Sequence, residues 1–183
     1  LCAWTQDQDD EFDWTRHTGA ATSGVGPPRA YSGDYYLHGK AGGRAPGDTA
    51  LLVLSDLSVY DDCALEFLYH MHKDAGTLSV EIKSRNSTWK LVFSITHNQE
   101  DWRTTRVVLP SATSAVRIRA TIGNSFYADI AIDRIGITPL TACNPSLSVH
   151  LDACGLTPHG GRCDVVCSIS EVRSSPHALC IDG

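Results

Sequence analysis

Alternation of apolar and polar residues is the feature of this sequence that most limits its fold. It occurs in residues 63–72, 78–83, 89–95 and 116–122. Successive side chains of a β-strand point to opposite faces, so the pattern predicts strands with one buried face. No long window repeats apolar residues at helical spacing. The sequence therefore predicts an all-β fold, an antiparallel sandwich or jelly roll. The residues expected on the core faces are Leu65, Phe67, Tyr69, Met71, Leu78, Val80, Ile82, Trp89, Leu91, Phe93, Ile95, Val116, Ile118, Ala120 and Ile122.

The alternation changes phase in residues 129–137. Apolar residues take even positions up to Ile132 and odd positions from Ile135. Either a β-bulge inserts one residue here, or both faces of the strand are buried. If both faces are buried, Asp133 points inward and needs hydrogen-bond donors or a cation to offset its desolvation. Otherwise a bulge turns Asp133 to solvent, or its carboxylate caps backbone amides.

Residues 7–13 contain five acids, bracketed by Trp4 and Trp14. Such a run is usually a solvated edge or loop, but two buried indoles predict that this one is anchored to the core. Carboxylates held close together repel one another, and a bound Ca²⁺ would relieve the repulsion. The run lacks the central glycine and terminal glutamate of an EF-hand loop.

Seven cysteines and a net charge of −6 restrict the setting and the partners. There is no Cys-x-x-Cys pair, so disulfides in an extracellular, oxidising compartment are favoured over zinc or free thiols. No run of Lys or Arg suggests a nucleic-acid partner or an anionic membrane surface. No apolar stretch is long enough for membrane insertion.

A series of motifs occurs in a fixed order along the first 143 residues. They are Leu-Cys-Ala-Trp-Thr-Gln-Asp at 1–7, Asp-Glu-Phe-Asp-Trp at 10–14, Gly-Pro at 26–27, Gly-Asp-Tyr-Tyr at 33–36, Ala-Leu-Leu at 50–52, the strand from Cys63 to Met71, Gly-Thr-Leu-Ser-Val at 76–80, Trp89, Trp102, Asp-Ile-Ala-Ile-Asp at 129–133 and Cys143. This series resembles a MAM domain, the adhesion module of meprins, neuropilin-like receptors and receptor tyrosine phosphatases.

The resemblance implies a jelly-roll domain over residues 1–143 with a non-catalytic extracellular role in adhesion, in a secreted protein or the ectodomain of a membrane protein. It implies protein partners at the cell surface, homophilic association among them, and no required cofactor. It also implies a disulfide between Cys63 and Cys143. Cys2 matches the second cysteine of a short N-terminal loop, so its partner is expected upstream of a chain that starts inside the module.

Calcium is a further expectation from the family, some of whose members hold a cation near the N-terminal acids and the last strand. Asp13 and Asp133 are the candidate ligands here. Two departures remove other candidates: the Asp-His-Thr element before the Gly-x-Tyr strand is replaced by residues 28–32, and Arg134 stands where a second acid is common.

The last 40 residues, 144–183, form a separate Cys-rich segment with four cysteines. Their spacing resembles the start of an EGF-like module, which implies Cys154–Cys167 and Cys163–Cys180 pairs. The fifth cysteine of that module is missing, because Asp182 stands in its place. Two other connectivities and a plain Cys-rich linker remain open.

No catalytic motif is present: the chain has neither a nucleophile elbow nor a phosphate loop. His70 and His72 lack the spacing of a helical zinc site. Asp9, Asp10 and Asp133 could form a glycosidase-like pair, so carbohydrate binding or cleavage stays a minor alternative. The main alternative is an accessory domain of a multidomain extracellular enzyme such as a meprin-like metalloprotease. Asn86 begins the sequon Asn-Ser-Thr, in an expected turn that could carry a glycan.

Overall fold

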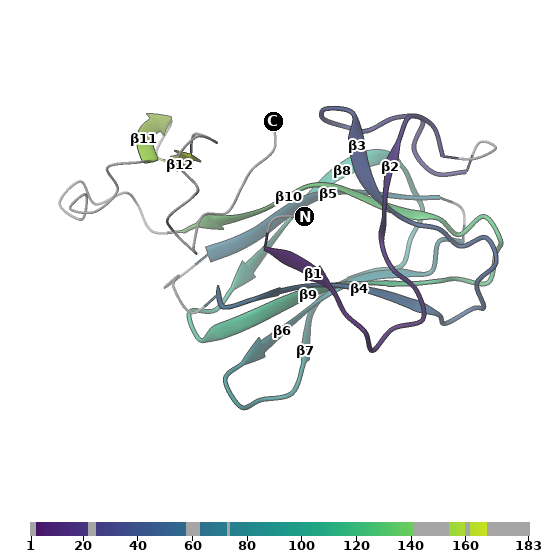
Figure 1. Ribbon diagram of the computed structural model, residues 1–183, viewed down its shortest axis with the longest axis horizontal. Coiled ribbons are helices and arrows are strands. Elements are labelled where there is room, and N and C mark those ends of the chain that lie inside the picture. The colour runs from purple at the N-terminus through teal and green to yellow at the C-terminus, as the bar shows by residue number, and fades with distance from the viewer. Residues whose placement is uncertain are drawn as a thin grey trace.

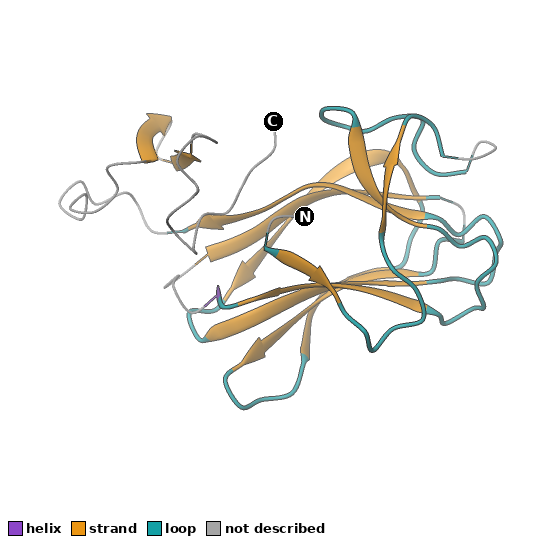
Figure 2. Cartoon of the chain, in the orientation of Figure 1, coloured by secondary structure: helices purple, strands orange, loops and turns teal. Residues whose placement is uncertain are grey.

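Two antiparallel β-sheets of five strands each pack face to face in the computed structural model (Figures 1 and 2). The structure describes residues 3–21, 25–57, 63–72 and 74–140, and the backbone of 154–159 and 162–167. In spatial order, sheet A contains β1 (Trp4–Gln6), β4 (Thr49–Ser55), β9 (Thr113–Thr121), β6 (Thr77–Ser84) and β7 (Lys90–Ile95). Sheet B contains β2 (Thr15–Thr18), β3 (Tyr35–Gly39), β10 (Ile130–Pro139), β5 (Cys63–Met71) and β8 (Gln99–Leu109). A separate hairpin pairs β11 (Cys154–His159) with β12 (Arg162–Cys167). The predicted β-sandwich is confirmed.

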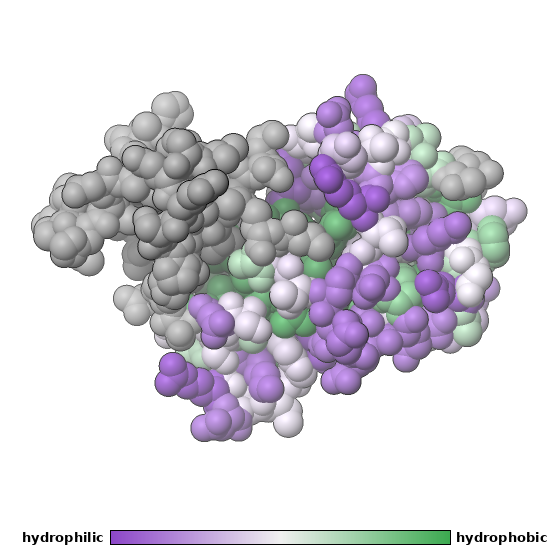
Figure 3. Space-filling view, in the orientation of Figure 1, coloured by the Kyte–Doolittle hydropathy of each residue, from purple (hydrophilic) through white to green (hydrophobic). Residues whose placement is uncertain are grey.

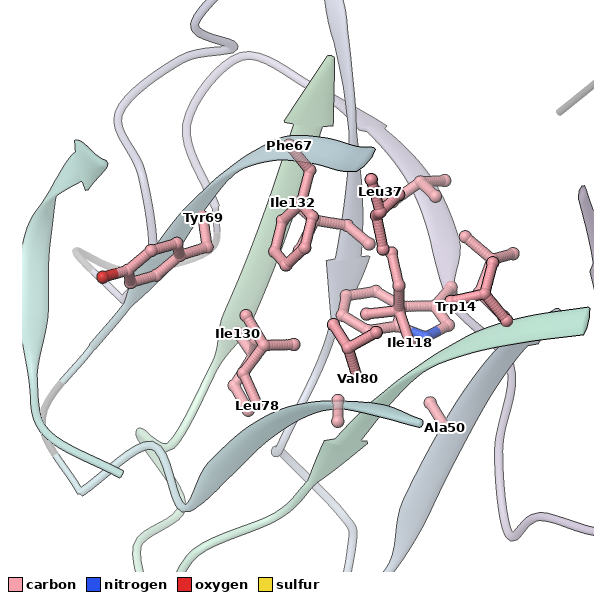
Figure 4. Close-up of a cluster of buried hydrophobic side chains, with 14 of the residues drawn as sticks. Trp14, Leu37, Ala50, Phe67, Tyr69, Leu78, Val80, Ile118, Ile130 and Ile132 are labelled. Carbon is pink, nitrogen blue, oxygen red and sulfur yellow. The ribbon is translucent and has the colours of Figure 1, made fainter. Parts of the chain in front are cut away.

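The core lies between the sheets and is built from the alternating residues of both (Figure 4). β5 contributes Leu65, Phe67, Tyr69 and Met71, as expected, and none of them is more than 7% exposed. The predicted core faces of β6 and β9 are also confirmed. Trp4 and Trp14 are buried, so the prediction that the acidic run is anchored holds as well.

One predicted core face is wrong in part, and a bulge explains it: Phe93 and Ile95 pack with the core as expected, whereas Trp89 and Leu91 do not. Leu91 on β7 is 56% exposed, while Val92 and Phe93 both pack partly against the core. The β6–β7 register shifts between Val80 and Glu81, which face Phe93 and Leu91. One extra residue therefore lies on β7, and the alternation reverses there. The motif at residues 50–52 belongs to β4, which lies inside its sheet, between β1 and β9.

The phase change in β10 is a bulge. Asp133 pairs with Leu68 and Gly136 with Glu66, so β10 has one more residue than β5 in this interval. Arg134 lies in this bulge and has a left-handed backbone conformation, with φ of 49°. The bulge lets Ile130 and Ile132 before it, and Ile137 after it, all reach the core.

The outer surface on the side shown in Figure 3 is mostly hydrophilic, with smaller apolar areas between. Over the described residues, no helix is long and apolar enough to cross a membrane.

Gly76 offers a test of how tightly the turn between β5 and β6 fits against β9. Its φ is +85°, and a Cβ there would lie 2.2 Å from the Thr121 carbonyl oxygen and 2.5 Å from the Gly123 nitrogen. Gly43 has the same φ of +85°, but nothing lies within 4 Å of its added Cβ. Gly76→Ala is expected to lower the free energy of unfolding by about 3 kcal/mol or more, through clash and backbone strain together. Gly43→Ala should cost only the strain, about 1 kcal/mol. Urea unfolding of the two variants checks this, and equal losses would contradict the packing described.

Candidate functional site

The outer face of sheet B carries a pocket where a loop crosses the ends of β5 and β8. We call it the β5–β8 pocket. Its volume is about 330 Å³. Three parts of the chain contribute: the loop before β3, the end of β5 and the start of β8. The lining residues are Pro28, Arg29, Ala30, Tyr31, His70, Glu100, Asp101 and Trp102.

An irregularity in β8 brings three consecutive residues to this pocket. Tyr69 pairs with Arg103 and Met71 with Gln99, so a step of two residues on β5 faces a step of four on β8. In a regular strand, neighbouring side chains would leave on opposite faces. The irregularity places Glu100, Asp101 and Trp102 opposite His70, at the same pocket.

His70 is buried at this site, with 2% of its surface exposed. Burial lowers its pKa from the ordinary value of 6.5, and a hydrogen bond with the Glu100 backbone opposes that shift. The ring is therefore neutral at pH 7. In the part of the chain that the structure describes, its Nδ1 has no hydrogen-bond partner.

Trp102 is half-buried and fixed on several sides. Its Nε1 donates a hydrogen bond of 3.1 Å to the carbonyl oxygen of Arg29. Its ring meets Tyr36 and His70 edge to face, at centroid distances of 5.9 and 5.8 Å. Burial raises the pKa of Tyr36 to about 12, with a smaller contribution from the charge of Asp129. The pocket wall is thus a packed aromatic cluster that holds its shape.

Exposed aromatic rings lie beside this cluster. Tyr31, which lines the pocket, is 55% exposed, and Tyr35 is 47% exposed. The guanidinium of Arg16 stacks on the Tyr35 ring, 3.5 Å from its centroid. Exposed tyrosines at a preformed surface are typical of protein interfaces.

Asp133 holds the loop that forms one wall of the pocket. Its Oδ2 accepts hydrogen bonds from the backbone amides of Tyr31, at 2.8 Å, and Ser32, at 3.0 Å. Its Oδ1 accepts one from the amide of Arg134 at 2.7 Å. The carboxylate is 8% exposed. A bulge is present, but it does not turn Asp133 to solvent as one alternative expected; the alternative that the carboxylate caps backbone amides is confirmed.

Asp129 has a similar role that the sequence reasoning missed. Its Oδ2 lies 2.9 Å from Nε2 of His38, and its Oδ1 accepts a hydrogen bond of 2.8 Å from the amide of Ala41. It is 5% exposed. The signal was available, because Asp129 shares its strand parity with Ala131 and Asp133. The pocket residues of β8 were also missed, since few of them are apolar.

The acidic run docks on the start of β4 in sheet A. Asp10 accepts a hydrogen bond of 2.6 Å from the amide of Leu51. Glu11 accepts hydrogen bonds from the amide and hydroxyl of Thr49, at 2.8 and 2.9 Å. These two bonds lower the pKa of Glu11. Desolvation and the neighbouring acids, Asp13 first among them, raise the pKa of Asp10 despite its own hydrogen bond.

The candidate calcium ligands therefore have different surroundings. Asp13 is exposed on the acidic run, while three amide donors surround the Asp133 carboxylate. Such donors point where a cation would have to bind, so the contacts of Asp133 do not fit a metal ligand. Among the described residues, no group of three or more His, Cys, Asp or Glu could hold a metal ion. Calcium binding stays a prediction.

Asp10 docks on sheet A and Asp133 on sheet B, which gives no support to a glycosidase-like pair.

The other predicted positions are described only in part. Asn86 is exposed in the turn between β6 and β7, with φ of 58°. Cys63 is buried at the start of β5. The backbone of the hairpin sets Cys154 opposite Cys167. Cys2, Cys143 and Cys180 lie outside the described residues, and the described register pairs Cys163 with Pro158.

Replacing Asp133 should release the loop. In Asp133→Ala the amides of Tyr31 and Ser32 lose their acceptor, so we expect a loss of about 2 kcal/mol in unfolding free energy and altered Trp102 fluorescence. Asp34→Ala removes an exposed acid close to the same loop and is the matched control. Chemical unfolding followed by fluorescence measures both; a change no larger than in the control would rule out the anchoring role.

Asp10 provides a test of the repulsion within the acidic run. Its raised pKa means that its ionised form destabilises the fold at pH 7. Asp10→Asn keeps an acceptor for Leu51 and should raise the unfolding free energy at pH 7 by up to about 1 kcal/mol. The difference should vanish below pH 3.8, where the wild-type carboxyl is neutral in both the folded and the unfolded chain. Asp9→Asn is the control, and a less stable Asp10→Asn at pH 7 would contradict this account.

The sequence is similar to those of known proteins in one family. The sequence model of the MAM domain, meprin/A5/mu, matches residues 1–144. MAM domain-containing glycosylphosphatidylinositol anchor protein 1 of Gallus gallus is 30% identical over 183 residues, covering 89% of this chain and 19% of that protein. Zonadhesin of Mus musculus is 28% identical over 155 residues, covering 79% of this chain and 3% of that protein. The chain thus spans less than a fifth of the length of these relatives.

A solved structure shares the fold. The K1 cleaved adhesin domain of Lys-gingipain from Porphyromonas gingivalis W83 superposes with a TM-score of 0.59 at 16% identity, covering 77% of this chain and 93% of that one. At this identity the likeness concerns the fold alone. The family model covers most of the chain, and the Gallus gallus relative carries the same domain in its name. This chain belongs to the MAM domain family.

Proposed function

We propose that this chain is a non-catalytic adhesion module, which binds proteins at the cell surface as part of a larger secreted or membrane-anchored protein. The observation that carries the proposal is the family match over residues 1–144. Relatives named for a glycosylphosphatidylinositol anchor and for adhesion support the extracellular setting. An accessory domain of an extracellular enzyme would differ in the parent chain rather than in this module.

The covered face of sheet B is the surface best suited to such contacts. Its loop is fixed through Asp133 and Trp102, so Tyr31 and Tyr35 are presented on a rigid support. Preorganised aromatic side chains cost little conformational entropy on binding. Homophilic association through this face is part of the proposal.

Disulfides and a glycan belong to the same extracellular proposal. Pro139 at the end of β10 pairs with Cys63, and Cys143 follows four residues later in the sequence, which supports a Cys63–Cys143 disulfide. The register of Cys154 opposite Cys167 supports that pair in the tail. The exposed turn at Asn86 supports glycosylation.

Cell binding tests the proposal. Biotinylated protein from a eukaryotic secretory host, assembled on labelled streptavidin, should bind cells of the source organism and lose binding after trypsin treatment of the cells. The double substitution Tyr31→Ser and Tyr35→Ser should weaken binding about tenfold, as expected for interface aromatics.

Leu91→Ser is the matched control, because Leu91 is 56% exposed on the other sheet and should not matter. Full binding to trypsin-treated cells, or equal losses in the two variants, would contradict the proposal. Sedimentation velocity on the same protein checks homophilic association, which predicts a dimer at high concentration.

A further inference from the structure

We propose that the β5–β8 pocket binds a neutral saccharide unit of a glycan, which gives the module a ligand beyond its protein contacts. The ligand would pack on the aromatic wall and form hydrogen bonds with the carboxylates of Glu100 and Asp101.

The pocket has the dimensions of a small-molecule site. Its volume of about 330 Å³ lies at the lower end of the range typical of ligand pockets. It opens beside the half-buried Trp102 and the exposed Tyr31. The apolar C–H face of a sugar ring packs on such aromatic side chains. The hydroxyl groups of the sugar then remain available for hydrogen bonds.

The charges of the lining select for a neutral ligand with many hydroxyl groups. Glu100 and Asp101 offer acceptors, whereas Arg29 offers donors. A simple cation would pair with the two acids but would leave Arg29 without an acceptor, and an anion would pair with Arg29 but would face the two acids. Sugar hydroxyls donate to carboxylates and accept from a guanidinium, so they can use both kinds of group.

These polar groups are not already used within the protein. Across the described part of the chain, neither Glu100 nor Asp101 forms an ion pair within 4 Å. His70 lines the same pocket and is only 2% exposed, and among the described residues its Nδ1 has no hydrogen-bond partner. Buried polar atoms in folded proteins are nearly always paired, so an unpaired one beside a pocket calls for an explanation.

The outer face of sheet A provides the contrast within the same chain. There Glu81 pairs with both Arg117 and Arg119, and the guanidinium of Arg117 covers the Trp89 ring at 4.4 Å. The acid and the two arginines therefore form ion pairs on sheet A, although Nε of Arg119 has no hydrogen-bond partner among the described residues. In the β5–β8 pocket residues of the same types remain available, on a support held by Asp133 and by the Trp102 hydrogen bond.

Saturation-transfer NMR with a panel of neutral methyl glycosides tests the inference, using the methyl glycosides of glucose, galactose, mannose, xylose and N-acetylglucosamine. At least one should receive saturation from the intact 183-residue protein and shift the Trp102 indole resonance. The isosteric double variant Glu100→Gln and Asp101→Asn should weaken binding about tenfold, through the loss of charge-assisted hydrogen bonds. Glu66→Gln, an acid on β5 that pairs with Arg106 at 3.0 Å, should bind as the wild type does.

Two outcomes of the glycoside experiment would overturn the inference. No saturation transfer from any glycoside, or transfer unchanged in the double variant, refutes a saccharide site here. Binding of N-acetylarginine amide in place of the glycosides would also refute it, in favour of a cationic side chain from a partner protein. Because the double variant replaces surface acids by their amides, its fold should be intact, which its amide spectrum verifies.

Discussion

The hydrogen bonds accepted by the Asp133 carboxylate are the interaction on which the proposed binding face of this domain depends. Sheet B has β10 at its centre, and the loop before β3 has to be held over its outer side. Asp133 does this by accepting hydrogen bonds from the backbone amides of Tyr31 and Ser32. A third hydrogen bond, from the amide of Arg134, stabilises the bulge from which Asp133 projects. One side chain therefore links the strand irregularity to the loop position. Without the loop, Tyr36 and Ala131 would lose their cover.

The outer faces of the two sheets differ in composition, and this difference explains why the pocket lies on sheet B. Sheet A keeps alternating charged residues outside, and Glu81 forms ion pairs there with both Arg117 and Arg119. Sheet B has a second, smaller apolar cluster outside, formed by Ala30, Tyr36 and Ala131 with Trp102 against it. An apolar outer face must be covered, and the segment that covers it creates edges and hollows. The pocket is thus a consequence of burying a face that a simple sandwich would leave to solvent.

The sequence predicted those parts of the fold that depend on alternation within one strand. β5, β6 and β9 have the expected core faces because the extra residues at their register irregularities lie on the partner strands or outside the predicted stretches. The face of β7 was wrong in part, because one extra residue at Val92 puts Leu91 outside the core while Phe93 and Ile95 remain in it. The pocket could not be predicted for the same reason: it depends on the mismatch between β5 and β8 at His70, which involves two strands far apart in sequence. The acidic run was correctly expected to be anchored, but its acceptor roles depend on Thr49 and Leu51, about 40 residues away.

A common role connects the acids that looked like a metal site. Asp10 and Glu11 accept hydrogen bonds from the backbone amides of Leu51 and Thr49. These two residues of β4 lie past the last residue that pairs with β1, whose pairing ends at Gln6. Asp129 accepts the amide of Ala41 just after β3 ends. In each case a carboxylate replaces a backbone carbonyl where no strand is available, because a buried amide cannot be left without an acceptor. The opposite pKa shifts of Asp10 and Glu11 show the balance involved: hydrogen bonds dominate for Glu11, while desolvation and like charges dominate for Asp10. Acids placed to complete strand ends are therefore a structural device of this fold, and their density alone does not indicate a bound cation.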